Sequence, residues 1–233
     1  MEINCLQSGS DGNCFAVYDG QTRLLIEAGI PYKKLLRGID FNLSRYDGCL
    51  LTHEHGDHSR AIKDLIKAGI DCFMSAGTAQ ALGVSGYRIK EVKALQPFTV
   101  GTYRVIAFDA KHDSIQPFGF VVKSAVTGES LCFITDSYYV PSQFKNIDYY
   151  LVECNYIHET LMNSNTHPEM KKRLFSSHMS MENCIKFLQA QDLSKCKKIY
   201  LTHISRTNGS GETMRREVQR ATGKETIIAG KDG

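Results

Sequence analysis

Short apolar segments alternate with glycine-rich turns along the first third of the chain. The strands predicted there are 3–7, 14–18, 23–27 and 48–52. The helices predicted there are 32–37 and 60–67. A polar, glycine-rich turn at 8–13 joins the first two strands, and the fourth strand leads directly into His53. The amphipathic helix after it should end at Gly69.

The rest of the chain returns to strands and then mixes them with helices. The further predicted strands are 71–74, 88–95, 102–109, 118–125, 130–135, 149–153, 198–202 and 225–229. A polar, helical region follows 149–153, and its clearest helix is 181–189; another helix is expected over 212–221. No repeat and no linker divides the sequence. We therefore expect one domain over 1–233, of the α/β (α+β) class, with two mixed sheets and helices outside them.

Composition sets few further limits. A chain of 233 residues can bury a substantial core. A net charge of +3 is too small to indicate nucleic-acid binding through the overall field, so any basic binding surface must be local.

The cysteines and the amino terminus bear on the compartment. Eight cysteines lie mostly in apolar runs and form no CxxC pair, which favours free buried thiols in a reducing environment over a disulfide framework. The first residues lack the basic and apolar regions of a signal peptide, and no apolar run approaches the roughly 20 residues of a membrane span. We expect a cytoplasmic protein that does not bind membranes.

The strongest chemical signal is the segment Thr52-His53-Glu54-His55-Gly56-Asp57-His58. A turn at the end of a strand can direct several imidazoles toward one point, and imidazole with carboxylate suits zinc, manganese or iron. The alternative is a solvated polar loop before the helix at Ser59. We interpret the segment as the centre of a metal site.

Three further candidate ligands follow apolar strands in the same way. They are His112, Asp136 and His203. Each alone fits a capping or surface residue, but together they repeat the arrangement at His53. The two oxygens of Asp136 could bridge a pair of ions.

At these residues the sequence resembles the metallo-β-lactamase superfamily over almost its whole length. The HxHxDH pattern is similar to the family's second motif, and the three later residues fall in the order of its third, fourth and fifth motifs. The resemblance implies a four-layer αββα sandwich and two divalent ions, zinc or manganese, with iron as a further candidate. It assigns His53, His55 and His112 to one ion, Asp57, His58 and His203 to the other, and Asp136 to both.

Finer features resemble the YycJ/WalJ-type exonuclease subgroup. They are the turn at 8–13 and the segments 134–137, 151–155, 177–180 and 202–206. RNase Z, a related endonuclease, has a glutamate and a histidine at places similar to Glu153 and His178. There the histidine protonates the leaving oxygen and the glutamate orients it. Two positions depart from the pattern, where Glu27 replaces an aspartate and Tyr156 replaces a histidine.

The resemblance implies a two-metal phosphodiesterase, most directly a DNA 5′-exonuclease-like nuclease that attacks with a metal-bridging hydroxide. The catalytic residues would be Asp57, Glu153 and His178, with His178 as general acid; a helix-capping role for His178 is the alternative. The residues expected to contact substrate are Arg206, Ser205, Asn13 and Asn155. Arg206 could bind a phosphate bidentately, and Asn13 could instead satisfy backbone groups of its turn.

Competing functions are a cyclic-nucleotide or other small phosphodiester hydrolase and, outside phosphate chemistry, a lactonase or thioesterase. The partner would be a nucleic acid or a nucleotide. Many members of the family are dimers, so a homodimer is a further expectation.

Overall fold

The structure is a computed structural model, and it describes residues 1–230. Contacts within the chain group it into two compact units. The first comprises Met1–Asp109 with Ser114–Glu129, and the second comprises Ala110–Asp113 with the chain from Ser130 onward. The expectation of one domain over 1–233 stays a prediction.

The first unit is built on a six-stranded sheet in the order β1-β2-β3-β4-β5-β6. Its strands are β1 (Glu2–Gln7), β2 (Cys14–Tyr18), β3 (Arg23–Ile26), β4 (Gly48–Leu50), β5 (Cys72–Met74) and β6 (Ile89–Glu91). The first three pair antiparallel, and β3 to β6 pair parallel. The parallel strands β3 and β4 bring Glu27 and the segment after Leu50 to the same edge of the sheet, which places the histidine segment there.

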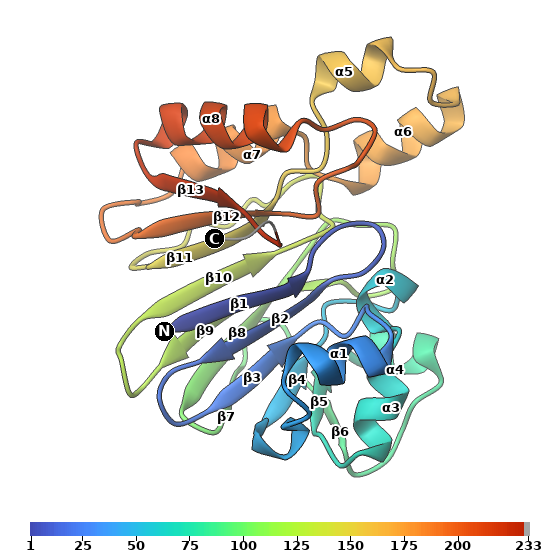
Figure 1. Cartoon of the computed structure of the whole chain (residues 1–233), viewed down its shortest axis with the longest axis vertical. Coiled ribbons are helices and arrows are strands. Elements are labelled where there is room, and N and C mark those ends of the chain that lie inside the picture. The colour runs from blue at the N-terminus through green and yellow to red at the C-terminus, as the bar shows by residue number, and fades with distance from the viewer. Residues whose placement is uncertain (231–233) are drawn as a thin grey trace. The chain divides into compact units, whose positions relative to one another are not determined.

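Helices cover one face of this sheet (Figure 1). They are α1 (Tyr32–Gly38), α2 (Gly56–Ser59), α3 (Ile62–Lys67) and α4 (Ala76–Leu82), with a short 3-10 turn at Leu43–Arg45. Leu35 of α1 and Leu65 of α3 are fully buried in one apolar cluster with Leu25 and Leu51 on the sheet side. Fully burying one such side chain contributes about 1.5–3 kcal/mol, so this cluster anchors the sheet edge that carries the histidines.

A second sheet packs on the other face. It consists in this unit of β7 (Pro97–Val100), β8 (Tyr103–Asp109) and β9 (Phe118–Ser124), all antiparallel. Phe98 of β7 stacks on Phe73 of β5 with ring centroids 5.3 Å apart. A Cβ at Gly48 would lie 2.8 Å from the Phe73 ring and 3.0 Å from Val100, so a glycine is needed for this close packing. The first unit therefore has three layers: helices, sheet and sheet.

The second unit contains four parallel strands, β10 (Ser130–Ile134), β11 (Tyr149–Glu153), β12 (Lys198–Thr202) and β13 (Glu225–Ile228). Its helices are α5 (His158–Asn163), α6 (Pro168–Ser177), α7 (Met181–Gln189) and α8 (Gly211–Thr222). α7 and α8 bury Phe187 and Val218 among their apolar residues, and Figure 1 shows both helices beside these strands. Because the strands are parallel, the residues after β10, β11 and β12 meet at one edge.

Most predicted elements are confirmed, with one clear correction. The strand predicted over 88–95 is only Ile89–Glu91, and Leu95 has a φ of 62° that breaks the extended backbone before β7 begins. All eight cysteines are free. Within residues 1–230 the structure has no helix of the length and apolarity that a membrane span requires.

Candidate metal centre

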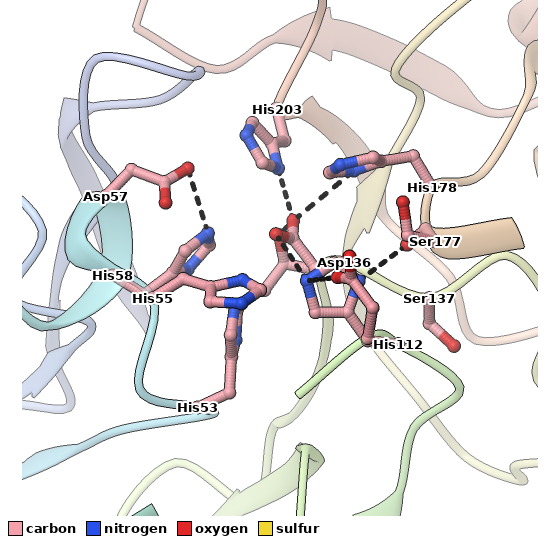
Figure 2. A network of polar contacts seen from close by, with 12 residues as sticks. His53, His55, Asp57, His58, His112, Asp136, Ser137, Ser177, His178 and His203 are labelled. Atoms are coloured by element: carbon pink, nitrogen blue, oxygen red, sulfur yellow. Dashed lines mark hydrogen bonds and ion pairs between the residues drawn. The ribbon is translucent and has the colours of Figure 1, made fainter. Parts of the chain in front are cut away.

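The histidine segment leaves the six-stranded sheet at the end of β4. The backbone of Leu51 and Thr52 continues the strand pairing, with Leu51 N–H donating to the Phe73 carbonyl at 2.9 Å. The chain then turns into α2, and the rings of His53, His55 and His58 come together. The His53 centroid lies 4.8 Å from that of His55 and 4.3 Å from that of His58 (Figure 2). The sequence prediction that this turn directs several imidazoles toward one point is confirmed.

Two neighbouring segments hold the turn in place. The Asp57 carbonyl accepts hydrogen bonds from the backbone N–H of Asn13 at 2.8 Å and from its side-chain amide at 3.2 Å. The His58 carbonyl accepts from Ala28 N–H at 2.8 Å. A Cβ on Gly29 would lie 1.7 Å from the Asp57 carbonyl oxygen. The glycine is therefore required for the approach of this segment to the ligand turn.

His58 is fully buried among polar groups of the first unit. Its Nδ1 lies 3.5 Å from Oε2 of Glu27, and its Nε2 lies 3.4 Å from Oδ2 of Asp57 and 3.3 Å from the Asn13 amide nitrogen. Glu27 is also fully buried and has a φ of 68°. A carboxylate behind a ligating imidazole fixes its ring and raises its basicity. Glu27 thus contacts His58 although it departs from the family's aspartate.

A second group of polar side chains lies at the strand edge of the other unit. Asp136 and His203 follow β10 and β12, are 2 % exposed each and have φ values of 45° and 52°. Non-glycine residues rarely adopt positive φ, and such strain clusters at functional sites. His203 Nδ1 contacts Asp136 Oδ1, and His112 Nε2 lies 3.5 Å from Asp136 Oδ2 (Figure 2). The three residues thus lie together, as the sequence pattern predicts, and their binding of a metal stays a prediction.

Glu153 and His178 form a pair in the same group. His178 Nδ1 lies 2.6 Å from Glu153 Oε1, while the other carboxylate oxygen accepts from Ser137 N–H and Met179 N–H at 3.1 Å each. Burial opposes protonation of His178, but the charge and hydrogen bond of Glu153 outweigh it, so the pKa of His178 is raised above its usual value. His178 therefore holds a proton more firmly than an ordinary histidine does.

The ring nitrogens of His112 have separate environments. Nδ1 lies 2.8 Å from the Ser177 carbonyl oxygen, which can accept only if Nδ1 carries the proton. Burial lowers the pKa of His112 and outweighs the nearby Asp136 carboxylate. The lowered pKa favours the neutral imidazole, and the Ser177 contact places its proton on Nδ1, so Nε2, which lies near the Asp113 and Asp136 carboxylates, is the nitrogen that could bind a metal.

The donor atoms of both groups fit a divalent metal. The first unit offers three clustered imidazoles with the Asp57 carboxylate beside them. In the second unit, ligand atoms of Asp136, Glu153, His178 and His203 lie within 4.8 Å of one another. Nitrogen and oxygen donors of these kinds suit zinc, manganese and iron alike, so the donor chemistry does not distinguish among the three.

The residues expected to contact substrate differ in exposure. Arg206 is exposed, and Ser205 is half-buried with its hydroxyl accepting from Asn208 N–H at 3.2 Å. Asn155 is buried and donates to the His203 carbonyl at 2.8 Å. Asn13 is buried against the histidine turn. Both asparagines thus hydrogen-bond to backbone next to candidate ligands. The sequence suggests this role only for Asn13. Contact of either asparagine with substrate stays a prediction.

The second departure from the subgroup pattern, Tyr156, lies in the interior. It is 2 % exposed, bridges to Ser180, and its ring packs against Phe175 with centroids 5.7 Å apart. His158 is exposed and lies against the same Phe175 ring at 5.2 Å. The tyrosine therefore packs the connection between β11 and α7.

Comparisons with known proteins agree with this geometry. Residues 22–204 match the family described as the Beta-lactamase superfamily domain. The chain is 31% identical to Exodeoxyribonuclease WalJ of Streptococcus pneumoniae, over 91% of this chain and 84% of that protein. It is 26% identical to Exodeoxyribonuclease YycJ of Bacillus anthracis, over 94% of this chain and 88% of that protein.

A solved structure gives independent support for the fold. The metallo-beta-lactamase fold protein YhfI from Bacillus subtilis is 17% identical and superposes with a TM-score of 0.76, covering 97% of this chain and 95% of that one. Together with the family match, this similarity confirms the fold class predicted from the sequence.

Proposed function

The chain belongs to the metallo-β-lactamase superfamily, and from that premise we propose that it is a metal-dependent phosphodiester hydrolase acting as a DNA exonuclease. Two relatives that align over more than nine-tenths of the chain carry the name exodeoxyribonuclease. The observation that carries the proposal is the Glu153–His178 pair beside Asp136, because an imidazole held by a carboxylate can protonate the departing sugar oxygen of a phosphodiester.

We propose that both units contribute ligands to one metal pair. The ligands are His53, His55 and His112 for one ion, Asp57, His58 and His203 for the other, and Asp136 for both. The clustered imidazoles of the first unit and the Asp136–His203–His112 group of the second support this assignment. Divalent ions held there would supply a Lewis acid that activates water and neutralises charge on the phosphate.

The chain's own residues then move the proton and bind the phosphate. His178 donates its proton to the departing sugar oxygen, since Glu153 raises its pKa and so favours the protonated imidazole. Glu153 orients the imidazole through its 2.6 Å contact and is itself fixed by two backbone N–H groups. Arg206, which is exposed close after His203, binds a non-bridging phosphate oxygen. Buried Asn155 and Asn13 hold the backbone of the ligands beside them.

The compartment and the oligomeric state belong to the same proposal. Eight free cysteines support a reducing, cytoplasmic location, because such thiols would oxidise or pair elsewhere. A homodimer stays a prediction from the family.

The experiment is a substrate panel with the purified protein loaded with manganese or zinc. The panel contains end-labelled DNA, labelled RNA, cyclic nucleotides, bis-p-nitrophenyl phosphate and a lactone. We expect DNA to be shortened progressively from one end, and an Asp136→Asn variant to lose this activity together with its metal. Hydrolysis of cyclic nucleotides with DNA left intact would replace the nuclease by a small-phosphodiester hydrolase. Lactone opening without any phosphodiester cleavage would overturn the proposal.

A further inference from the structure

A cavity of about 290 Å³ opens in the second unit, outside the metal-ligating group. One wall is the irregular segment 138–143 that follows β10, and the other is a single face of α7 with the residues flanking it. Ligand pockets for small molecules measure roughly 300–1,000 Å³. The volume of the cavity is just below that range, which suits one planar group better than a strand of nucleic acid.

The lining combines three kinds of side chain. Tyr138 and Tyr139 are 38% and 58% exposed, so both rings are accessible to a ligand. Phe187, which is buried, also lines the cavity. Asn183 offers an amide, and exposed Lys186 has no ion pair among residues 1–230. Aromatic faces, an amide and an uncompensated cation are the groups that recognise a base joined to a phosphate.

Two residues that line the cavity, Tyr138 and Met179, directly follow along the chain residues that contact or form the Glu153–His178 pair. Ser137 N–H and Met179 N–H donate to the same oxygen of Glu153, at 3.1 Å each. Tyr138 directly follows Ser137, and Met179, the residue after His178, itself lines the cavity. The wall therefore begins one residue from the Glu153–His178 pair. We place at this opening the nucleotide next to the one whose leaving oxygen lies at His178.

We propose that this cavity is a subsite for the nucleobase of a nucleotide flanking the cleaved phosphodiester bond, with Tyr139 stacking on the base. The inference rests on the proposed nuclease function. Stacking on an aromatic face tolerates any base, because every base has such a face. The subsite would thus give the enzyme a grip on single-stranded DNA without sequence selectivity.

The test compares two single-stranded oligonucleotides that differ only in whether the flanking sugar carries a base or is abasic. We expect the wild-type protein to cleave the normal oligonucleotide with a kcat/KM about 10-fold above that of the abasic one. Tyr139→Ala should remove this difference in kcat/KM, whereas Tyr139→Phe, which keeps the aromatic ring, should retain it. The matched control is Tyr87→Ala, because Tyr87 is an 80% exposed tyrosine of the first unit. An equal loss on both oligonucleotides, or no base dependence in the wild type, would overturn the subsite.

A binding measurement separates failure of the subsite from failure of the nuclease. A methylphosphonate-linked oligonucleotide with 2-aminopurine at one of its first three positions cannot be cleaved, and its fluorescence is quenched when the base stacks. We expect quenching at one position with wild type, Tyr139→Phe and Tyr87→Ala, and its loss with Tyr139→Ala. Quenching that survives in Tyr139→Ala refutes the subsite even if the protein is a nuclease. Absence of cleavage with base-specific quenching intact refutes only the nuclease.

Discussion

Gly29 is the position where a single added methyl group should disable the first half of the metal centre. A Cβ there would lie 1.7 Å from the Asp57 carbonyl oxygen and 2.7 Å from the backbone nitrogen of His58. Ordinary contact for such atoms begins near 3.4 Å, so the Asp57 carbonyl must retreat by about 1.7 Å. The ligand turn cannot absorb that movement without displacing Asp57 and His58 from their neighbours.

The cost follows from two contributions. Forcing a methyl group into packed backbone destabilises a protein by about 1–3 kcal/mol. The displaced carbonyl also loses its hydrogen bonds from Asn13, which contribute about 0.5–1.5 kcal/mol each. We expect Gly29→Ala to lower the free energy of unfolding by about 2–6 kcal/mol. A displacement of more than 1 Å should also weaken metal binding at least tenfold, since misplaced ligands lose coordination geometry.

Gly56 provides the matched control within the same turn. It lies between His55 and Asp57, and a Cβ there meets nothing within 4 Å. Gly56→Ala should therefore keep the stability and metal content of the wild type. The assay is metal content by plasma mass spectrometry after dialysis, together with urea unfolding of each variant. Wild-type metal content and stability in Gly29→Ala would refute the argument that this close approach positions the ligands.

Three further predictions concern the proton donor and the asparagines. His178→Ala should lower kcat for a phosphodiester by about 100-fold or more with unchanged metal content; metal loss would make His178 a ligand instead. Activity should fall as pH rises through the raised pKa of His178. Glu153→Gln should shift this fall in kcat to lower pH, because it removes the charge that favours the protonated imidazole. An unchanged pH–kcat profile in Glu153→Gln would contradict the pairing of Glu153 with His178. Asn13→Ala should reduce stability and metal affinity together, because the side chain supports Gly9, Asp57 and His58; a raised KM with intact stability would establish substrate contact.

Much of the fold was predictable because its strands are short apolar runs that end in turn residues. The strand over 130–135 and the helix over 181–189 carry strong patterns and appear within one residue of the predicted bounds as β10 and α7. The helix α4 escaped prediction, since Ala76–Leu82 has little amphipathic pattern and is defined by its Ser75 cap and the left-handed Gly83. β6 was predicted too long because a sequence pattern does not reveal the positive φ of Leu95.

The candidate site was predictable in chemistry more than in geometry. The spacing from His53 to His58 indicates clustered imidazoles, and the ring distances agree. The contact of Glu27 with His58 was not predictable. Glutamate has a longer side chain than the aspartate usual at this position, and the sequence does not show which residue its carboxylate reaches. The sequence also does not show which group the Asn155 side chain contacts; in the structure its amide donates a hydrogen bond to the His203 carbonyl. Such contacts depend on backbone positions that only the folded chain defines.

The claim on which the account depends is that seven side chains hold two adjacent ions. Anomalous X-ray scattering from crystals of the manganese- or zinc-loaded protein tests it most directly. We predict two peaks per chain. One has nitrogens of His53, His55 and His112 about 2.0–2.1 Å away when the ion is zinc, the other lies at Asp57, His58 and His203, and Asp136 is shared between them. No peak at these side chains, or peaks that omit His112, Asp136 or His203, would contradict the account.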